Sequence, residues 1–359
     1  MAENVLKVRE LDTDGIPGRE ISLTDIDFTP LDYETLRNAK LHQRLEIPLR
    51  GRGRMHASVG LDIDEGENAT FSTILASKFT SKSIGLVKGG WLPSALASIG
   101  NAVVLPDRCV VAQLNSRLKN GATKNGSDPD FIDLFADGPV RINPLLFVLE
   151  GDGGKNPTTD IVGKNLAEAV SKLRSALPHC EIVAADEEGL KGVLGLIEDT
   201  RAGMERKQAF LLEVNQKLKS PVSRKLRGEI WDQVICAAKN HAVPTSSLVV
   251  LAALSSIVAP QGRNPAKGLL KFGEKYSSKD AYNGLADIRA LELLMALYCL
   301  FPDQRLMLCT ADKDMALFWV GIDASNFRIQ GSHFGFDIKP THLLPNVSDI
   351  QWSGFIAGS

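Results

Sequence analysis

Four acidic residues of this chain stand where apolar segments meet the next loop or helix: Asp107, Glu150, Asp287 and Asp312. Carboxylates that are drawn together repel one another, and a bound divalent cation removes that repulsion. Oxygen donors of this kind suit Mg²⁺ or Mn²⁺ better than zinc. The residue types therefore predict a magnesium or manganese site, to which Asp314 would add a further carboxylate.

Each of the four acids also has a simpler structural explanation. Asp107 and Asp287 could cap the helices that follow them. Asp312 could belong to an ordinary turn, and Glu150 could face water at the end of a helix. The hypothesis of a metal site therefore depends on the four acids together rather than on any one of them.

Two of the acids follow segments that we predict to be buried strands. Ala102–Leu105 (AVVL) precedes Asp107, and Arg305–Thr310 (RLMLCT) precedes Asp312. Helical spacing resumes after each of them, and strands that alternate with helices predict an α/β sheet with parallel strands. Ligands of such sheets bind beyond the carboxyl ends of the strands, where both acids would lie.

Most of the remaining chain has helical patterning. We predict helices at Leu145–Glu150, Leu166–Leu177, Lys191–Leu218, Arg224–Asn240, Ser246–Val258 and Leu285–Leu300, with Asp287 close to the start of the last. Asp128 followed by Pro129 predicts one more helix, with Asp128 as its cap. Ile84–Val87 is a short strand-like run in the amino-terminal part, and Arg50–Arg54 (RGRGR) is expected to be an exposed basic loop.

Charge is distributed unevenly along the chain. The whole sequence carries a net charge of −2, whereas residues 201–279 contain fourteen Lys and Arg and five Asp and Glu, a net of +9. Such a segment is typical of a surface that meets a polyanion, although solvated helices would also explain it. Within it Arg263, Lys267, Lys271 and Lys275 recur every four residues, and we expect them to bind nucleic acid.

Other features exclude several classes of protein. No apolar stretch is long enough to cross a membrane, and the first residues lack the apolar core of a signal peptide. The five cysteines are odd in number and far apart, which predicts reduced core thiols in a cytoplasmic protein. Gly151–Lys155 (GDGGK) lacks the Ser or Thr that a nucleotide-binding phosphate loop needs after its Lys.

Three stretches of the chain resemble the PIN-domain family of metal-dependent nucleases. Val103–Leu114 (VVLPDRCVVAQL) resembles the opening strand of that family, whose terminal Asp is the first metal ligand. Tyr282–Trp319 resembles its carboxyl-terminal signature, an Asp at the start of a helix followed by a strand that ends in a T-x-D-x-D or similar motif. The segment LLFVLEG places Glu150 where the family carries its second acid.

The resemblance implies a PIN-like parallel sheet flanked by helices and divided by an insertion. We expect an amino-terminal α+β extension, two halves of the PIN-like core with a helical basic insertion between them, and a tail: residues 1–100, 101–165, 166–279, 280–322 and 323–359. The insertion would explain why Glu150 and Asp287 are much further apart than in compact members of the family.

The resemblance also implies an endoribonuclease that leaves a 5′-phosphate and a 3′-hydroxyl. Asp107 and Asp312 would be direct ligands of Mg²⁺ or Mn²⁺, Glu150 and Asp287 direct or water-mediated ligands, and Thr310 and Asp314 supporting residues. RNA is the expected partner, and a homo-oligomer or a regulatory protein partner is left open. The alternatives are a catalytically silent PIN-like protein that binds nucleic acid or assembles with other proteins, and a metal-dependent phosphatase or flap-type DNA nuclease.

Overall fold

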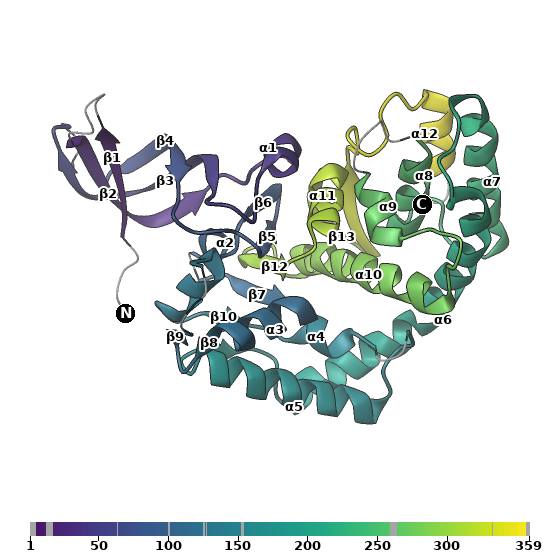
Figure 1. The fold of residues 1–359 in the computed structure, drawn as a ribbon, viewed down its shortest axis with the longest axis horizontal. Coiled ribbons are helices and arrows are strands. Elements are labelled where there is room, and N and C mark those ends of the chain that lie inside the picture. Colours follow the sequence, from purple (N-terminus) through teal and green to yellow (C-terminus); the bar gives the residue numbers. More distant parts are fainter. Residues whose placement is uncertain are drawn as a thin grey trace.

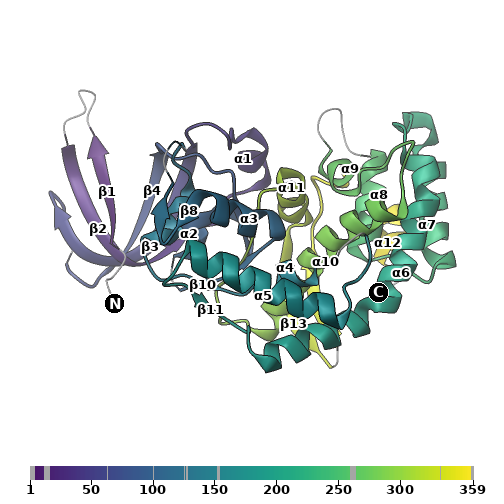
Figure 2. The same cartoon turned by 60° about the horizontal axis from the view of Figure 1, so that its bottom comes forward.

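The computed structural model describes residues 5–11, 17–62, 64–99, 101–124, 126, 128–151, 154–258, 264–331 and 333–356. An amino-terminal sheet lies at one end of the molecule and the helices α6, α7 and α8 at the other, with a central sheet between them (Figure 1). A view turned by 60° shows the same sequence of parts (Figure 2). None of the helices in the described ranges combines the length and apolar character that crossing a membrane requires.

The amino-terminal sheet is an antiparallel meander. Its strands within the described residues are β1 (Leu6–Leu11), β2 (Pro17–Phe28), β3 (Glu46–Val59) and β4 (Asn68–Ala76), with α1 (Tyr33–Asn38) between β2 and β3. The basic run Arg50–Arg54 lies inside β3, so the prediction of a loop was wrong. Side chains alternate between the faces of a strand, and the two glycines of the run occupy the buried face. A Cβ at Gly51 would lie 2.8 Å from the Phe71 ring, and one at Gly53 would lie 2.8 Å from the Thr24 carbonyl oxygen, so neither position has room for a side chain.

The central sheet is mixed and mostly parallel, which confirms the α/β class. In the described part of the chain its order is β11 (Glu181–Ile182), β10 (Arg141–Ile142), β7 (Val103–Pro106), β12 (Leu306–Thr310), β5 (Ile84–Val87) and β6 (Gly90–Pro93). The first four strands are parallel, and β5 and β6 run antiparallel to their neighbours. The sheet therefore includes strands before residue 101, and β11 lies in the expected helical insertion, between two of its predicted helices.

The two strands predicted from apolar runs are adjacent and parallel. Leu306 pairs with Val103 and Cys309 with Pro106, and every residue of both strands is buried. Parallel neighbours end at the same edge of a sheet, so Asp107 and Asp312 emerge side by side from its carboxyl edge.

Helices cover the central sheet on both sides, with α3 and α5 below it and α10 and α11 to its right in Figure 1. Their bounds are α2 (Ser94–Ser98), α3 (Arg108–Arg117), α4 (Leu145–Leu149), α5 (Thr159–Ala176), α6 (Glu187–Leu218), α7 (Arg227–Asn240), α8 (Leu248–Val258), α9 (Pro265–Leu270), α10 (Ser278–Leu300), α11 (Lys313–Ile322) and α12 (Asp349–Ile356). Short 3₁₀ helices cover Phe131–Ala136 and Arg224–Leu226, and two hairpins consist of β8 (Leu118–Lys119) with β9 (Ala122–Thr123) and β13 (Ala324–Gln330) with β14 (His333–Ile338).

Two predicted helix starts were wrong. The short helix after Pro129 is capped by Asp130, whose side chain accepts the Ile132 N–H, and not by Asp128. Helix α10 begins at Ser278 behind a capping box made by Ser277 and Asp280. Asp287 therefore lies well inside α10 and cannot serve as its cap.

The buried core joins both sheets to the surrounding helices. Trp231 is 2% exposed, in agreement with its prediction as a core residue. The prediction that the cysteines are core thiols holds in part. All five are free thiols: Cys299 and Cys309 are buried, Cys180 is intermediate, and Cys109 and Cys236 are partly open to solvent.

Candidate active site

A cavity of about 860 Å³ lies at the carboxyl edge of β7 and β12. All five predicted metal ligands line it: Asp107, Glu150, Asp287, Asp312 and Asp314. They come from the turn after β7, the end of α4, the interior of α10 and the first turn of α11. The fold thus collects into one cavity acids that are widely separated in the sequence.

Asp107 is fixed at the end of β7 by three hydrogen bonds. Its Oδ1 accepts the Val110 N–H at 2.7 Å, which makes it the cap of α3, and its own N–H donates to the Cys309 carbonyl at 3.0 Å. The Thr310 hydroxyl also bonds to its carboxylate. Burial raises the pKa of Asp107, and the hydrogen bonds from Thr310 and Val110 oppose that shift.

Asp312 has the equivalent place after β12. Its Oδ1 accepts the N–H groups of Asp314 and Met315 at 2.7 and 3.1 Å, so Asp312 caps α11. Its own N–H donates to the Thr310 Oγ1 at 3.0 Å. Thr310 therefore contacts both acids at the sheet edge.

Asp287 reaches the cavity from α10. Burial raises the pKa of its carboxyl group to about 8, the negative charge of Asp312 adds to the shift, and Lys271 opposes it. A carboxylate so placed loses its hydration and meets other negative charges, and both effects disfavour ionisation. A cation in the cavity would therefore favour the ionised form of Asp287.

Glu150 is the residue after the last turn of α4, and a buried arginine holds that turn in place. Arg289, only 4% exposed, donates from Nη2 to the Leu149 carbonyl at 2.6 Å and from Nη1 to Asn156 Oδ1 at 3.0 Å. Asn165 Nδ2 donates to the Glu150 carbonyl at 3.4 Å. Our reading of the sequence missed Arg289, and the signal that could have found it is a charged residue on the apolar side of the predicted helix.

The pKa of the Cys109 thiol indicates that the four acids lie near one another. Burial raises its pKa to about 11, and the charges of Asp107, Glu150, Asp287 and Asp312 all add to the shift. A single group thus lies within electrostatic reach of all four. The raised pKa also leaves this cysteine as a poor nucleophile, because the thiolate is the reactive form.

The donor chemistry of the cavity fits Mg²⁺ or Mn²⁺, because every candidate ligand is a carboxylate. Among the residues that the structure describes, no three Asp, Glu, His or Cys side chains already stand in a metal-binding arrangement. Asp107 and Asp312 each use one carboxylate oxygen as a helix cap, and the Asp107 carboxylate also bonds to the Thr310 hydroxyl. Asp314 packs against α9, where a Cβ at Gly268 would lie 2.0 Å from its Oδ2.

Of the four basic residues that we expected to contact nucleic acid, three lie in the described ranges, and one of these three lines the cavity. Lys271 lines the cavity, just after α9, in a left-handed conformation with a φ of 55°. Lys267 is half-buried on α9, where burial lowers its pKa, and Lys275 is exposed, but neither lines the cavity. Arg263 lies outside the described residues. Because α9 ends at Leu270, the four-residue spacing does not correspond to one helical face.

Part of the positive charge of residues 201–279 is paired. Lys207 contacts Glu292 at 2.7 Å, Lys219 contacts Glu274 at 3.0 Å, and Arg201 contacts Glu198 at 2.9 Å. By contrast, Lys40, Lys82 and Arg108, which we had not selected from the sequence, line the cavity. No local pattern marks them, because they come from three separate segments.

Comparisons of the chain with protein-family models, with curated proteins and with solved structures found no match. The cavity and its side chains therefore carry the evidence for function.

Proposed function

We propose that this protein is a PIN-like, Mg²⁺- or Mn²⁺-dependent nuclease that hydrolyses phosphodiester bonds, with RNA as the expected substrate. The observation that carries the proposal is the presence of Asp107, Glu150, Asp287 and Asp312 in one cavity at the carboxyl edge of a mostly parallel sheet. That edge is the usual place for a site in an α/β fold. The sequence resemblance to PIN-domain nucleases adds support, since it selects the same four acids.

In this proposal some side chains would bind the cation, and others would fix the orientation of those ligands. Asp107 and Asp312 would hold it from the sheet edge, where the caps of α3 and α11 and the Thr310 hydroxyl fix their orientation. Glu150 and Asp287 would complete the ligand set from α4 and α10. When bound, the ion supplies a hydroxide nucleophile near neutral pH and offsets charge on the scissile phosphate.

The cavity also has side chains suited to phosphate. Lys271 lies near Asp287, as its effect on the pKa of that acid shows, and it can neutralise a phosphate oxygen that enters the cavity. Lysine acts here as a point charge with three donors. Hydrolysis at this site would leave a 5′-phosphate and a 3′-hydroxyl, as the family resemblance implies.

A silent PIN-like binding or assembly protein is the second candidate. It is favoured by the capping hydrogen bonds of Asp107 and Asp312, which give both acids a structural reason to be present without catalysis. Asp287 has no such role, because it lies inside α10 rather than at its start. The place of Asp287 in the cavity beside the other acids is therefore better explained by a metal site.

Cleavage of an end-labelled single-stranded RNA, with Mn²⁺, with Mg²⁺ and with EDTA, tests the proposal. We expect cleavage with either metal and none with EDTA. Asp107→Asn and Asp287→Asn should each lower the rate by about 100-fold or more, because each removes a charged group that orients the reacting atoms.

Glu292→Gln is the matched control. It removes a carboxylate from the same helix as Asp287, and Glu292 is paired with Lys207 outside the cavity. Cleavage by this variant should equal that of the wild type. Metal-dependent cleavage that survives unchanged in Asp287→Asn would rule out the proposed site, and binding of RNA without any cleavage would favour the silent protein.

A further inference from the structure

Three basic side chains from the amino-terminal third of the chain form part of the cavity wall: Lys40, Lys82 and Arg108. We call them the basic rim. They belong to the loop after α1, the segment before β5 and the first turn of α3. Each of the three is held in place by a different contact, so their presence at one cavity is built into the fold.

Lys40 is positioned by the element that also carries Asp312. The Lys313 Nζ donates to the carbonyl oxygens of Arg37 and Ala39 at 3.1 and 2.8 Å. These bonds fix the end of α1 against the start of α11. The loop that follows α1 is thereby held at the mouth of the cavity, and Lys40 is exposed on it.

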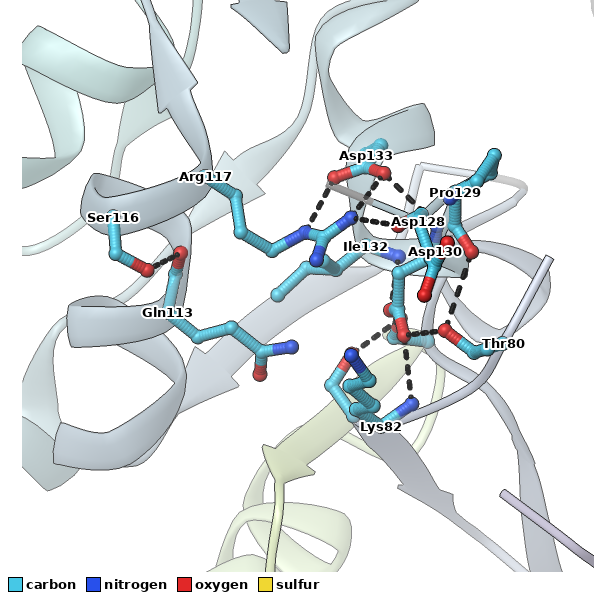
Figure 3. Close-up of polar contacts among 12 residues, drawn as sticks. Thr80, Lys82, Gln113, Ser116, Arg117, Asp128, Pro129, Asp130, Ile132 and Asp133 are labelled. Atoms are coloured by element: carbon cyan, nitrogen blue, oxygen red, sulfur yellow. Dashed lines mark hydrogen bonds and ion pairs between the residues drawn. The ribbon is translucent and has the colours of Figure 1, made fainter. Parts of the chain in front are cut away.

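Lys82 is positioned by a buried polar network (Figure 3). The Asp130 Oδ2 accepts the Lys82 N–H at 2.9 Å and the Thr80 hydroxyl at 2.6 Å, and Asp130 is fully buried. Asp130 caps the short 3₁₀ helix Phe131–Ala136, and Arg117 of α3 binds that helix. Arg117 donates from Nε and Nη2 to the two carboxylate oxygens of Asp133 at 2.8 and 2.7 Å. Such a satisfied buried network is rigid, so the backbone of Lys82 has a fixed place next to α3.

Arg108 is the first residue of α3, directly after Asp107. Its guanidinium lies over the Phe147 ring at 5.0 Å from the ring centroid. This cation–π contact orients the side chain. Arg108 also lines the cavity, in the turn directly after Asp107.

The basic rim is not neutralised by ion pairs with the described residues. None of the three side chains forms an ion pair with any residue in the described ranges, although five carboxylates line the same cavity. Cations that served to neutralise those acids would lie against them. Unpaired cations that surround an acidic centre are instead suited to an anion that extends past it.

We propose that Lys40, Lys82 and Arg108 bind a phosphate of a polynucleotide next to the one that is cleaved. The inference rests on the proposed function for the position of the scissile phosphate, and it identifies the substrate as a chain of phosphodiesters rather than a phosphate monoester. It also places the substrate track on the amino-terminal side of the cavity and not along the basic segment 201–279.

Binding in EDTA tests the rim without requiring catalysis. The probe is a fluorescein-labelled oligouridylate of about twelve nucleotides, followed by fluorescence anisotropy from about 50 to about 200 mM KCl. The triple variant Lys40→Ala, Lys82→Ala, Arg108→Ala should bind about 10-fold or more weakly at low salt. The slope of log affinity against log salt should become shallower by about 0.7, since the rim contacts one phosphate and each single-strand phosphate contact contributes about that amount.

The control triple is Lys217→Ala, Arg224→Ala, Lys275→Ala, which removes the same charge from exposed positions of the basic segment. It should bind as the wild type does. The charge-conserving triple Lys40→Arg, Lys82→Arg, Arg108→Lys should keep most of the affinity and will show whether a loss reflects charge or folding.

Unchanged affinity and slope in the rim triple would overturn the inference, as would an equal loss in the control triple or a wild type that does not bind the probe. A wild type that binds through the rim but cleaves no RNA with Mn²⁺ would contradict the proposed function and leave the rim intact. The two failures are thus distinguishable.

Discussion

At the residue scale, Asp287 combines burial with nearby negative charge, and the two together keep its carboxyl group protonated near neutral pH. Its pKa of about 8 in the folded chain compares with about 3.9 for an Asp in an unfolded one. A proton bound more tightly by the folded state stabilises that state at low pH. This contribution is fully present below pH about 4 and is lost as the pH rises through about 8.

The first prediction follows from that sign. In EDTA, Asp287→Asn should be more stable than the wild type at pH about 8.5 by about 1–3 kcal/mol, because the amide cannot ionise. The difference should shrink as the pH falls toward 4, where both side chains are neutral. Urea unfolding at several pH values measures it, and a variant destabilised equally at every pH would show that the carboxylate is not under strain in the cavity.

Asp107 is both a helix cap and a candidate ligand, and the second prediction separates these roles. Asp107→Asn should retain the cap of α3, whereas Asp107→Ala should cost about 1 kcal/mol of unfolding free energy. RNA cleavage should be lost in both variants. Asp32→Ala, which removes the cap of α1 away from the cavity, should lose stability and keep cleavage. Cleavage that is kept in Asp107→Asn and lost only in Asp107→Ala would contradict the assignment of Asp107 as a ligand.

At the element scale, α4 and α10 are joined through one arginine, and the position of Glu150 depends on that junction. Arg289→Met removes the bonds to Leu149 and Asn156 and leaves buried acceptors unsatisfied, which should cost about 2 kcal/mol or more. Because Arg289 positions Glu150, we expect kcat for RNA to fall and KM to change less. Unfolding by urea and steady-state cleavage together measure the effect, and a variant that loses stability but keeps kcat would show that Arg289 is only structural.

Elements with long or strongly apolar patterns could be predicted from the sequence. The helices at α5, α6, α7, α8 and α10 and the strands β7 and β12 were found because their periodicity or burial is visible in a single segment. Strands β10 and β11 have two residues each and owe their state to pairing with β7 and with each other, which no local pattern reveals. Arg50–Arg54 was assigned to a loop because the sequence does not show that Gly51 and Gly53 lie on the buried face of a strand, against Phe71 and the Thr24 carbonyl oxygen.

The candidate site, like the fold, could be predicted only where a local sequence pattern marks its residues. Asp107 and Asp312 could be placed because each directly follows a strand with a recognisable pattern. Arg289 and the basic rim were not found, because a buried charge in a helix and three cations on separate loops acquire meaning only from tertiary packing. The regular spacing of Lys267, Lys271 and Lys275 misled for the opposite reason, since the helix that would align them ends at Leu270.

At the scale of the whole molecule, five acidic side chains line the cavity. Basic side chains lie both on the cavity wall and on the outer helices. Of the three lysines expected to bind nucleic acid within the described residues, Lys271 is the one at the cavity. We therefore predict that Lys271→Ala raises KM for RNA cleavage by about 10-fold, as expected for the loss of about 1.4 kcal/mol of binding. Lys275→Ala should leave KM unchanged. An equal rise in KM in both variants would instead support residues 201–279 as the surface that binds RNA.

The molecule also brings the amino-terminal region into the cavity, since Lys313 holds the end of α1 beside Asp312. Residues of this region, among them Lys40, therefore line the same cavity as the acids. This arrangement joins the acids at the sheet edge to the cations that would guide a polynucleotide toward them.

The central claim is that the four carboxylates bind a catalytic divalent cation, and anomalous diffraction from crystals soaked in Mn²⁺ tests it most directly. We predict an anomalous peak inside the cavity, within coordination distance of Asp107 and Asp312 and with Glu150 or Asp287 among its direct or water-mediated ligands, at about 2.2 Å for each direct oxygen ligand. The peak should be absent from crystals of the variant Asp107→Asn, Asp312→Asn. A saturating soak that leaves the cavity without a peak, or places Mn²⁺ only at other sites, would contradict the account.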